Sequence, residues 1–238
     1  MIEREKKSET EIRKFIDGRG IDIAAIIIEP IQGEGGDNHF RGEWLRKLRE
    51  ICDENDILLI FDEVQTGLCT TGRTWCCQHF DVQPDLLAFG KKVQVCGVMA
   101  GPRLDEVKDN AFRLPSRLNS TWGGNFTDMV RSTHYLRIIE KENLVENAAK
   151  VGAYFLEQLL NWQRGCEIVS AVRGRGLFIA FDLPDGETRD KVWRKLFDSG
   201  LLVLKSGEGS IRFRPALDIT KEVVDETMEI LRKCCLPK

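Results

Sequence analysis

The sequence lacks the patterns that identify several common classes of protein. None of its apolar runs approaches the roughly 20 residues that a membrane-spanning helix requires. Its eight cysteines include no Cys-x-x-Cys spacing, so we expect no metal site and predict reduced thiols in a cytoplasmic protein. It has no glycine-rich loop ending in Lys-Ser or Lys-Thr, which argues against a P-loop nucleotide site.

Length and charge describe an ordinary globular protein. The 238 residues are 42% apolar and carry a formal net charge of −3. Such a balance gives no electrostatic preference for nucleic acid or for an anionic membrane. The length allows one large domain or two modest ones. We therefore expect neither a nucleic-acid partner nor a membrane partner.

The first part of the chain alternates short apolar runs with helical patterns. Runs at 23–28, 57–61 and 86–89 predict strands, and a weaker strand is expected at 98–100. Residues 43–54 carry apolar side chains at the helical period instead. This alternation favours a parallel sheet covered by helices, with the strands buried.

From about residue 127 the pattern changes to longer helices and a second set of strands. We predict helices at 127–141, 144–162, 187–199 and 220–234, and strands at 177–183, 201–204 and 211–213. The last part is therefore interpreted as an α+β block. We divide the chain into 1–162, which belongs to a large parallel-sheet domain with a linking helix, and 163–238, a small α+β domain.

Two charged residues follow predicted strands. Asp62 comes directly after the run at 57–61, and Lys91 lies two residues after the run at 86–89. Active groups in open α/β sheets collect at the carboxyl ends of strands. An enzyme that uses pyridoxal phosphate (PLP) needs an amine to form a Schiff base and a carboxylate to keep the pyridine nitrogen protonated. Each residue alone is weak evidence, because acidic pairs also bind Mg²⁺ and lysine pairs are usually solvated.

The surrounding motifs resemble those of the class III, fold type I PLP aminotransferases. The matching residues are Asp62-Glu63-Val64-Gln65-Thr66-Gly67, Pro84-Asp85 and Gly90-Lys91. The resemblance implies an α/β fold that contains part of the large parallel-sheet domain and the C-terminal α+β small domain. It also implies PLP as the cofactor and a homodimer with shared active sites.

The resemblance assigns cofactor roles position by position. Lys91 would be the Schiff-base lysine and the acid/base, and it is preferred to Lys92 because the family's lysine directly follows a small residue. Asp62 would pair with the pyridine nitrogen. Val64 would pack on one face of the ring, and Gln65 would hydrogen-bond its phenolic oxygen.

Further roles concern the phosphate and the substrate. Ser120 and Thr121 would reach the cofactor phosphate of a neighbouring subunit, although a plain turn is the alternative for this segment. Arg212 matches the arginine that binds a substrate α-carboxylate, and Arg214 is the competing choice. Glu34, on a glycine-rich loop, matches the glutamate that pairs with this arginine when no substrate acid is present.

Within the class, the sequence is most similar to enzymes that move the ε-amino group of L-lysine to 2-oxoglutarate, giving 2-aminoadipate 6-semialdehyde and glutamate. The 4-aminobutyrate aminotransferases are the alternative. The chain resembles the C-terminal portion of such an enzyme, so a non-catalytic fragment that needs a complementing chain is a third interpretation. Leu68-Cys69-Thr70 departs from the family pattern, where a glycine-containing loop is usual.

Overall fold

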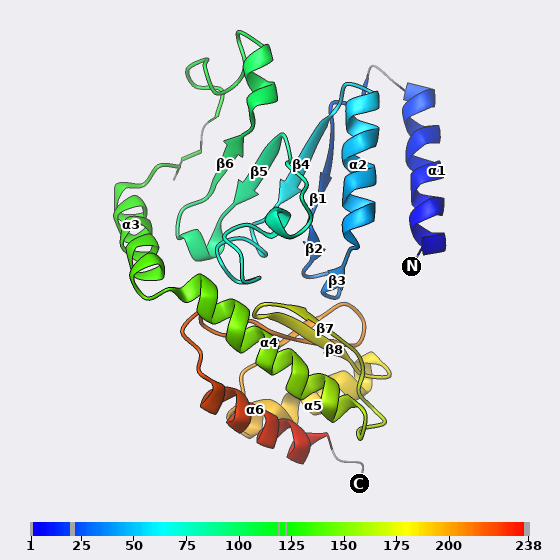
Figure 1. Cartoon of the computed structure of the whole chain (residues 1–238), viewed down its shortest axis with the longest axis vertical. Coiled ribbons are helices and arrows are strands. Elements are labelled where there is room, and N and C mark those ends of the chain that lie inside the picture. Colours follow the sequence, from blue (N-terminus) through cyan, green and yellow to red (C-terminus); the bar gives the residue numbers. More distant parts are fainter. Residues whose placement is uncertain (1, 20–21, 119, 122, 236–238) are drawn as a thin grey trace. The chain divides into compact units, whose positions relative to one another are not determined.

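The computed structural model describes residues 2–19, 22–118, 120–121 and 123–235, which form two compact units (Figure 1). The first unit comprises Met1–Pro30, Phe40–Gln65 and Cys77–Met129. The second comprises Ile31–His39, Thr66–Cys76 and Val130–Lys238. The second unit thus includes residues 130–162. The division into domains 1–162 and 163–238 stays a prediction.

The first unit is built on a four-stranded sheet. Its order is β1-β4-β5-β6, with β1 at Ala25–Ile28, β4 at Leu58–Asp62, β5 at Leu86–Phe89 and β6 at Gly97–Ala100. The first three strands are parallel, as predicted, but β6 runs antiparallel to β5. The connection between them is too short for the crossover that parallel neighbours need, and this explains the error.

The strands of this sheet are less buried than their apolar runs predict. Leu59 and Phe61 of β4 are fully buried, but Ile27 of β1 is 64% exposed. Successive side chains of a strand point to opposite faces. An all-apolar run therefore does not prove that both faces are covered, and the prediction of burial is wrong for Ile27.

Helices accompany this sheet. The helix α1 (Ile2–Arg19) lies beside α2 (Gly42–Glu54) in Figure 1, and an Arg13–Glu54 ion pair of 2.7 Å joins them. The apolar stripe of α2 is buried, as its period predicts. Short 3₁₀ turns follow at η2 (Cys76–His79), η3 (Lys91–Val93) and η4 (Pro102–Glu106). The longer helix α3 (Phe126–Lys141) begins in this unit and continues in the second.

The second unit contains an antiparallel sheet and a small hairpin. The sheet order is β7-β8-β10-β9, with β7 at Ser170–Arg175, β8 at Phe178–Asp182, β9 at Leu204–Ser206 and β10 at Ser210–Phe213. The hairpin pairs β2 (Ile31–Gln32) with β3 (Asn38–His39). Strand β7 and the hairpin were not predicted, because neither carries an apolar run.

Three helices complete the second unit, namely α4 (Leu144–Gln163), α5 (Gly186–Asp198) and α6 (Lys221–Cys234). Their apolar faces share one core with the sheet, where the rings of Phe155 and Phe213 meet edge to face at 4.9 Å. The Asp185 side chain caps α5 by accepting a hydrogen bond from Thr188 N at 2.7 Å. Within the described part of the chain, none of the helices has the length and apolar character that crossing a membrane requires.

Candidate functional site

Asp62 ends β4, and Lys91 follows the end of the adjacent parallel strand β5 by two residues. Asp62 is the last residue of β4 and pairs in register with Ala88 of β5. The amide of Glu63 donates to Ala88 O at 2.9 Å, so the two strand ends are tied together. The Asp62 carboxylate is oriented by its own turn, since Oδ1 accepts from Val64 N at 3.0 Å. The sheet thus brings a carboxylate and a lysine to one edge.

Lys91 is held in an unusual backbone conformation. It is exposed and begins η3 with φ of +48°, in the left-handed region. For a residue with a side chain this conformation costs about 1–2 kcal/mol, and such strain is found at functional sites. Among the described residues, Lys91 Nζ has no hydrogen-bond or ion-pair partner, whereas Lys92 Nζ donates to Gln65 O at 2.7 Å. Lys91 is therefore the lysine of this pair whose amine is open for chemistry.

The residues around this edge fit the ring of the expected cofactor. Gly90 is buried, and a Cβ added there would come within 3.6 Å of Val64 Cγ1 and 3.0 Å of Cys96 Sγ. Glycine therefore leaves room for Cys96 Sγ beside the chain before Lys91, with Val64 at ordinary van der Waals distance. An apolar face from Val64, a carboxylate and an amine are the groups that a pyridine ring with an aldehyde requires. The amide side chain of Gln65 comes from the same turn.

Ser120 and Thr121 lie in an open segment of the first unit. Both side chains are exposed, and the amide of Gly123 donates to Ser120 O at 3.0 Å. Thr121 lines an open pocket of about 360 Å³ together with residues 123–127. Asn119 and Trp122 of the same motif lie outside the described residues. The proposed contact of Ser120 and Thr121 with a neighbouring subunit stays a prediction.

The second unit brings two acid–arginine pairs together. Arg212 of β10 pairs with Glu34, and Arg214 pairs with Asp37 at 2.5 Å. The two arginines are two positions apart, so they leave the chain on the same side. Their partners differ, because the Glu34 side chain is 70% exposed whereas that of Asp37 is fully buried.

This difference separates the two candidate arginines. Arg214 is fixed by the buried Asp37 and by the ring of Phe178, whose centroid lies 3.3 Å from the Arg214 Cζ atom. Arg212 faces a carboxylate that is open to solvent. An exposed carboxylate can move away and leave its arginine to a substrate acid. Of the two arginines, Arg212 is therefore the one whose partner is exposed, and its role in substrate binding stays a prediction.

Burial controls the charges around these pairs. Desolvation raises the pKa of Asp37, and the hydrogen bond and charge of Arg214 oppose this effect. The pKa of His39 falls to about 3, first because of burial and then because of the charges of Arg173, Arg175 and Arg214. His39 is therefore neutral at physiological pH, and its ring meets Phe178 edge to face at 6.3 Å.

Sequence reasoning missed two residues of this region. Asp37 follows the glycine-rich loop and Arg173 lies in β7. Both are polar residues in segments without an apolar period, so no local pattern marks them. In the segment Leu68-Cys69-Thr70, which departs from the family pattern, Leu68 and Cys69 have φ of +46° and +69°. Glycine is favoured in that conformation. This backbone conformation explains why a glycine is usual in the family loop, although this chain has other residues there.

No group of three or more histidine, cysteine, aspartate or glutamate side chains within the described residues is arranged to hold a metal ion.

Comparisons with known proteins identify the family and the fold. A model of the class-III aminotransferase family matches residues 2–235. The L-lysine-epsilon aminotransferase of Mycobacterium tuberculosis is 49% identical over 233 residues, which are 98% of this chain and 52% of that protein. The Streptomyces clavuligerus protein of that name is 47% identical and covers 88% of this chain and 46% of its own length.

A solved structure gives the same result for the fold. The lysine aminotransferase from M. tuberculosis superposes with a TM-score of 0.95 at 49% identity, over 97% of this chain and 53% of that one. The chain therefore spans about half the length of the curated relatives that it matches.

Proposed function

Since the chain belongs to the class-III aminotransferase family, we propose that it acts in the PLP-dependent transfer of the ε-amino group of L-lysine to 2-oxoglutarate. The observation that carries the proposal is the placement of Asp62 and Lys91 at the ends of adjacent parallel strands. Relatives named L-lysine-epsilon aminotransferase support lysine as the amine donor. The products would be 2-aminoadipate 6-semialdehyde and glutamate.

The cofactor-binding residues would have distinct tasks. When bound, PLP supplies an aldehyde that accepts the amine and a ring that takes up electrons. Asp62 would face the ring nitrogen, with its orientation fixed by the amide of Val64. The Val64 side chain would exclude water from one ring face, and Gln65 would donate to the phenolic oxygen. Lys91 Nζ would hold the cofactor and take up the proton from the substrate carbon that bears the amine.

The substrate-binding residues explain how two different substrates are accepted. Arg212 would bind the α-carboxylate of 2-oxoglutarate or glutamate through its planar fork of donors. With lysine as the substrate, Glu34 would stay paired with Arg212 and neutralise it. We also propose a cytoplasmic homodimer in which Ser120 and Thr121 reach the partner's cofactor phosphate.

The test of this function uses two neighbouring lysines. The chain would be incubated with PLP, reduced with borohydride and digested, and the labelled peptide would be identified. Label on Lys91, and loss of label and turnover in Lys91→Ala but not in Lys92→Ala, would support the assignment. Label on Lys92, or equal label on several surface lysines, would refute it.

The amine donor is tested separately with 2-oxoglutarate as the common acceptor. Formation of glutamate from L-lysine but not from 4-aminobutyrate is expected. Preference for 4-aminobutyrate would favour the competing activity within the class. Absence of both cofactor binding and turnover in the chain alone would favour the non-catalytic fragment that needs a complementing chain.

A further inference from the structure

The loop that carries Glu34 is held by segments that are distant in the sequence. Gly207 N, in the turn between β9 and β10, donates to Glu34 O at 2.9 Å. Arg173 of β7 donates to Gly36 O, and its Nε donates to Asp37 O at 2.8 Å. The backbone of the loop Gly33–Asp37 is therefore fixed on both sides of Gly35.

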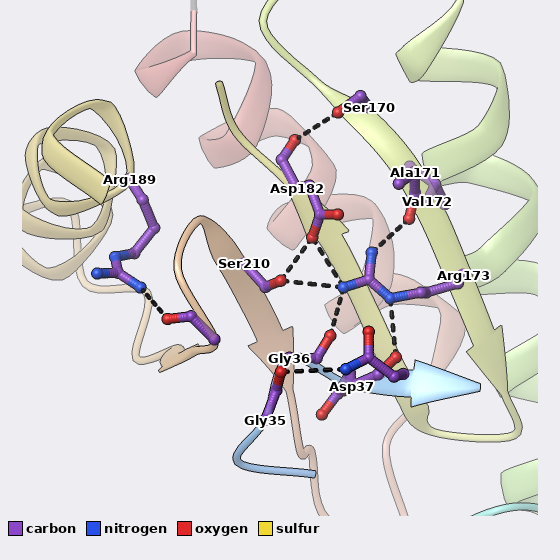
Figure 2. A network of polar contacts seen from close by, with 12 residues as sticks. Gly35, Gly36, Asp37, Ser170, Ala171, Val172, Arg173, Asp182, Arg189 and Ser210 are labelled. Carbon is purple, nitrogen blue, oxygen red and sulfur yellow. Dashed lines mark hydrogen bonds and ion pairs between the residues drawn. The ribbon is translucent and has the colours of Figure 1, made fainter. Parts of the chain in front are cut away.

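Arg173 is itself fixed by several acceptors, as Figure 2 shows. Its Nη2 atom donates to Asp182 Oδ1 at 2.7 Å and to Ser210 Oγ at 3.0 Å, and its Nη1 donates to Ala171 O at 2.6 Å. The guanidinium thus joins the loop to β8 and β10. A guanidinium carries its N–H donors on three nitrogens in one plane, so Nε, Nη1 and Nη2 can serve acceptors on different sides at once, whereas a lysine has a single nitrogen.

A break in strand β7 aims this side chain. The register between β7 and β8 shifts between Ser170 and Arg173, and Ala171 has φ of +48°. Bulges of this kind redirect side chains and are common next to functional sites. The left-handed Ala171 costs free energy that a regular strand would avoid. The bulge places the Ala171 carbonyl where it accepts from the arginine that it redirects.

Glycines allow the loop and the turn to touch through their backbones. Gly36 has φ of +125° and Gly207 has φ of +50°. A Cβ added at Gly207 would lie 2.9 Å from Gly36 Cα and 3.1 Å from Gly35 O. No side chain separates the two segments, so a small shift of either one would move Glu34.

We propose that Arg173 is a positioning residue, which holds the loop Gly33–Asp37 so that the Glu34 side chain alone moves between Arg212 and solvent. The role rests on the proposed function, in which Glu34 leaves Arg212 when a substrate acid binds. Asp37 supports it, because its buried pair with Arg214 fixes the end of the loop. Glu34 differs from Asp37 in two ways. Its side chain is exposed, and its bond to Gly207 is made by the main-chain oxygen.

The first test measures the loop and needs no activity. Amide hydrogen exchange of Gly36, Asp37 and Gly207 would be followed in the chain, in Arg173→Met and in Arg173→Lys. These amides donate to Gly33 O at 3.3 and 3.1 Å and to Glu34 O at 2.9 Å. We expect at least about tenfold faster exchange in Arg173→Met, because several charge-assisted hydrogen bonds are lost.

The comparison variants make this test specific. Arg173→Lys keeps the charge but not the fork, so it should show an intermediate rate, and it carries the test if Arg173→Met does not fold. Arg194→Met is the matched control, because Arg194 is an exposed arginine of α5 that pairs with Asp198. Unchanged exchange in both Arg173 variants, or an equal increase in the control, would overturn the proposal.

The second test asks whether Arg173 acts through Glu34. The rate of the lysine half-reaction would be measured in Arg173→Met, in Glu34→Ala and in the double variant. If Arg173 positions Glu34, Arg173→Met should have a slower lysine half-reaction than the parent. The double variant should then be hardly slower than Glu34→Ala alone. Fully additive losses would show a general structural role and refute the proposal. If no variant or parent transaminates, the proposed function fails, whereas the exchange result still decides the role of Arg173.

Discussion

The partly buried imidazole of His39, whose Nε2 atom is shielded from solvent, should make the stability of the second unit depend on pH. The pKa of His39 is lowered from 6.5 to about 3 in the fold, mainly by burial. His39 of the unfolded chain therefore binds a proton below about pH 6.5, whereas His39 of the folded chain stays neutral until the pH is near 3. The contribution of this residue to stability is full above about pH 7 and is lost as the pH falls through 6.5 toward 3.

The size of the loss follows from this window. Where unfolding takes up one proton, the free energy of unfolding falls by about 1.4 kcal/mol for each pH unit. It should therefore fall by about 2 kcal/mol between pH 7 and pH 5. That is a large part of a typical stability of about 5–15 kcal/mol. Protonation would also add a positive charge beside Arg173, Arg175 and Arg214, in contact with the ring of Phe178.

Urea denaturation at pH 7, 6 and 5 would measure this loss. In His39→Phe, which keeps an apolar ring next to Phe178, the fall in unfolding free energy should be smaller than in the parent by about 2 kcal/mol. The control His134→Gln removes a histidine from an exposed position of α3 and should keep the parent's pH dependence. Parallel curves for parent and His39→Phe, or a His39 ring that titrates near pH 6.5 by NMR, would refute the reasoning.

Two further predictions concern the substrate residues and a close backbone contact. Glu34→Ala should slow the lysine half-reaction by about tenfold more than the glutamate half-reaction, since it removes the carboxylate that faces Arg212. Arg212→Ala should mainly weaken 2-oxoglutarate binding. Equal losses of both half-reactions in single-turnover assays of the two variants would contradict this. Gly152→Ala should destabilise the chain by about 3 kcal/mol, because its Cβ would lie 2.2 Å from the Gly176 backbone. Gly165→Ala, with its nearest neighbour 4.0 Å away, should be nearly neutral in thermal unfolding.

The helices and most of the apolar strands could be predicted from the sequence, because their signals are local; the strand predicted at 201–204 is wrong, since β9 begins at Leu204 and ends at Ser206. The pattern at 43–54 became α2 with the expected buried stripe, and the run at 86–89 became β5. Strand β7 could not be found in this way, since it is held by β8 and carries the polar Arg173 and Arg175. The direction of β6 was also missed, because a run of apolar residues says nothing of the direction of its partner.

The positions of Asp62 and Lys91 at strand ends were predictable, because motif and strand coincide. The roles of these and the other site residues remain proposals. Neither Asp37 nor the bulge that aims Arg173 could be predicted. The bulge depends on the pairing of β7 with β8, and Asp37 is held by residues more than 130 positions away, as in the bond from Arg173 Nε to Asp37 O. Such pairs follow from the fold of the second unit, and no local pattern records them.

The loop Gly33–Asp37 carries two carboxylates in different surroundings. Glu34 and Asp37 are three residues apart, and each pairs with an arginine of the segment 212–214. Burial makes the Asp37–Arg214 pair costly to break, because either partner alone would be a charge without solvent. In the Glu34–Arg212 pair only the carboxylate is exposed, and water can solvate it when it is released, whereas Arg212 is buried and needs a substrate carboxylate in its place. A fixed pair beside an opening pair is what the acceptance of both an amine and a diacid at Arg212 would require.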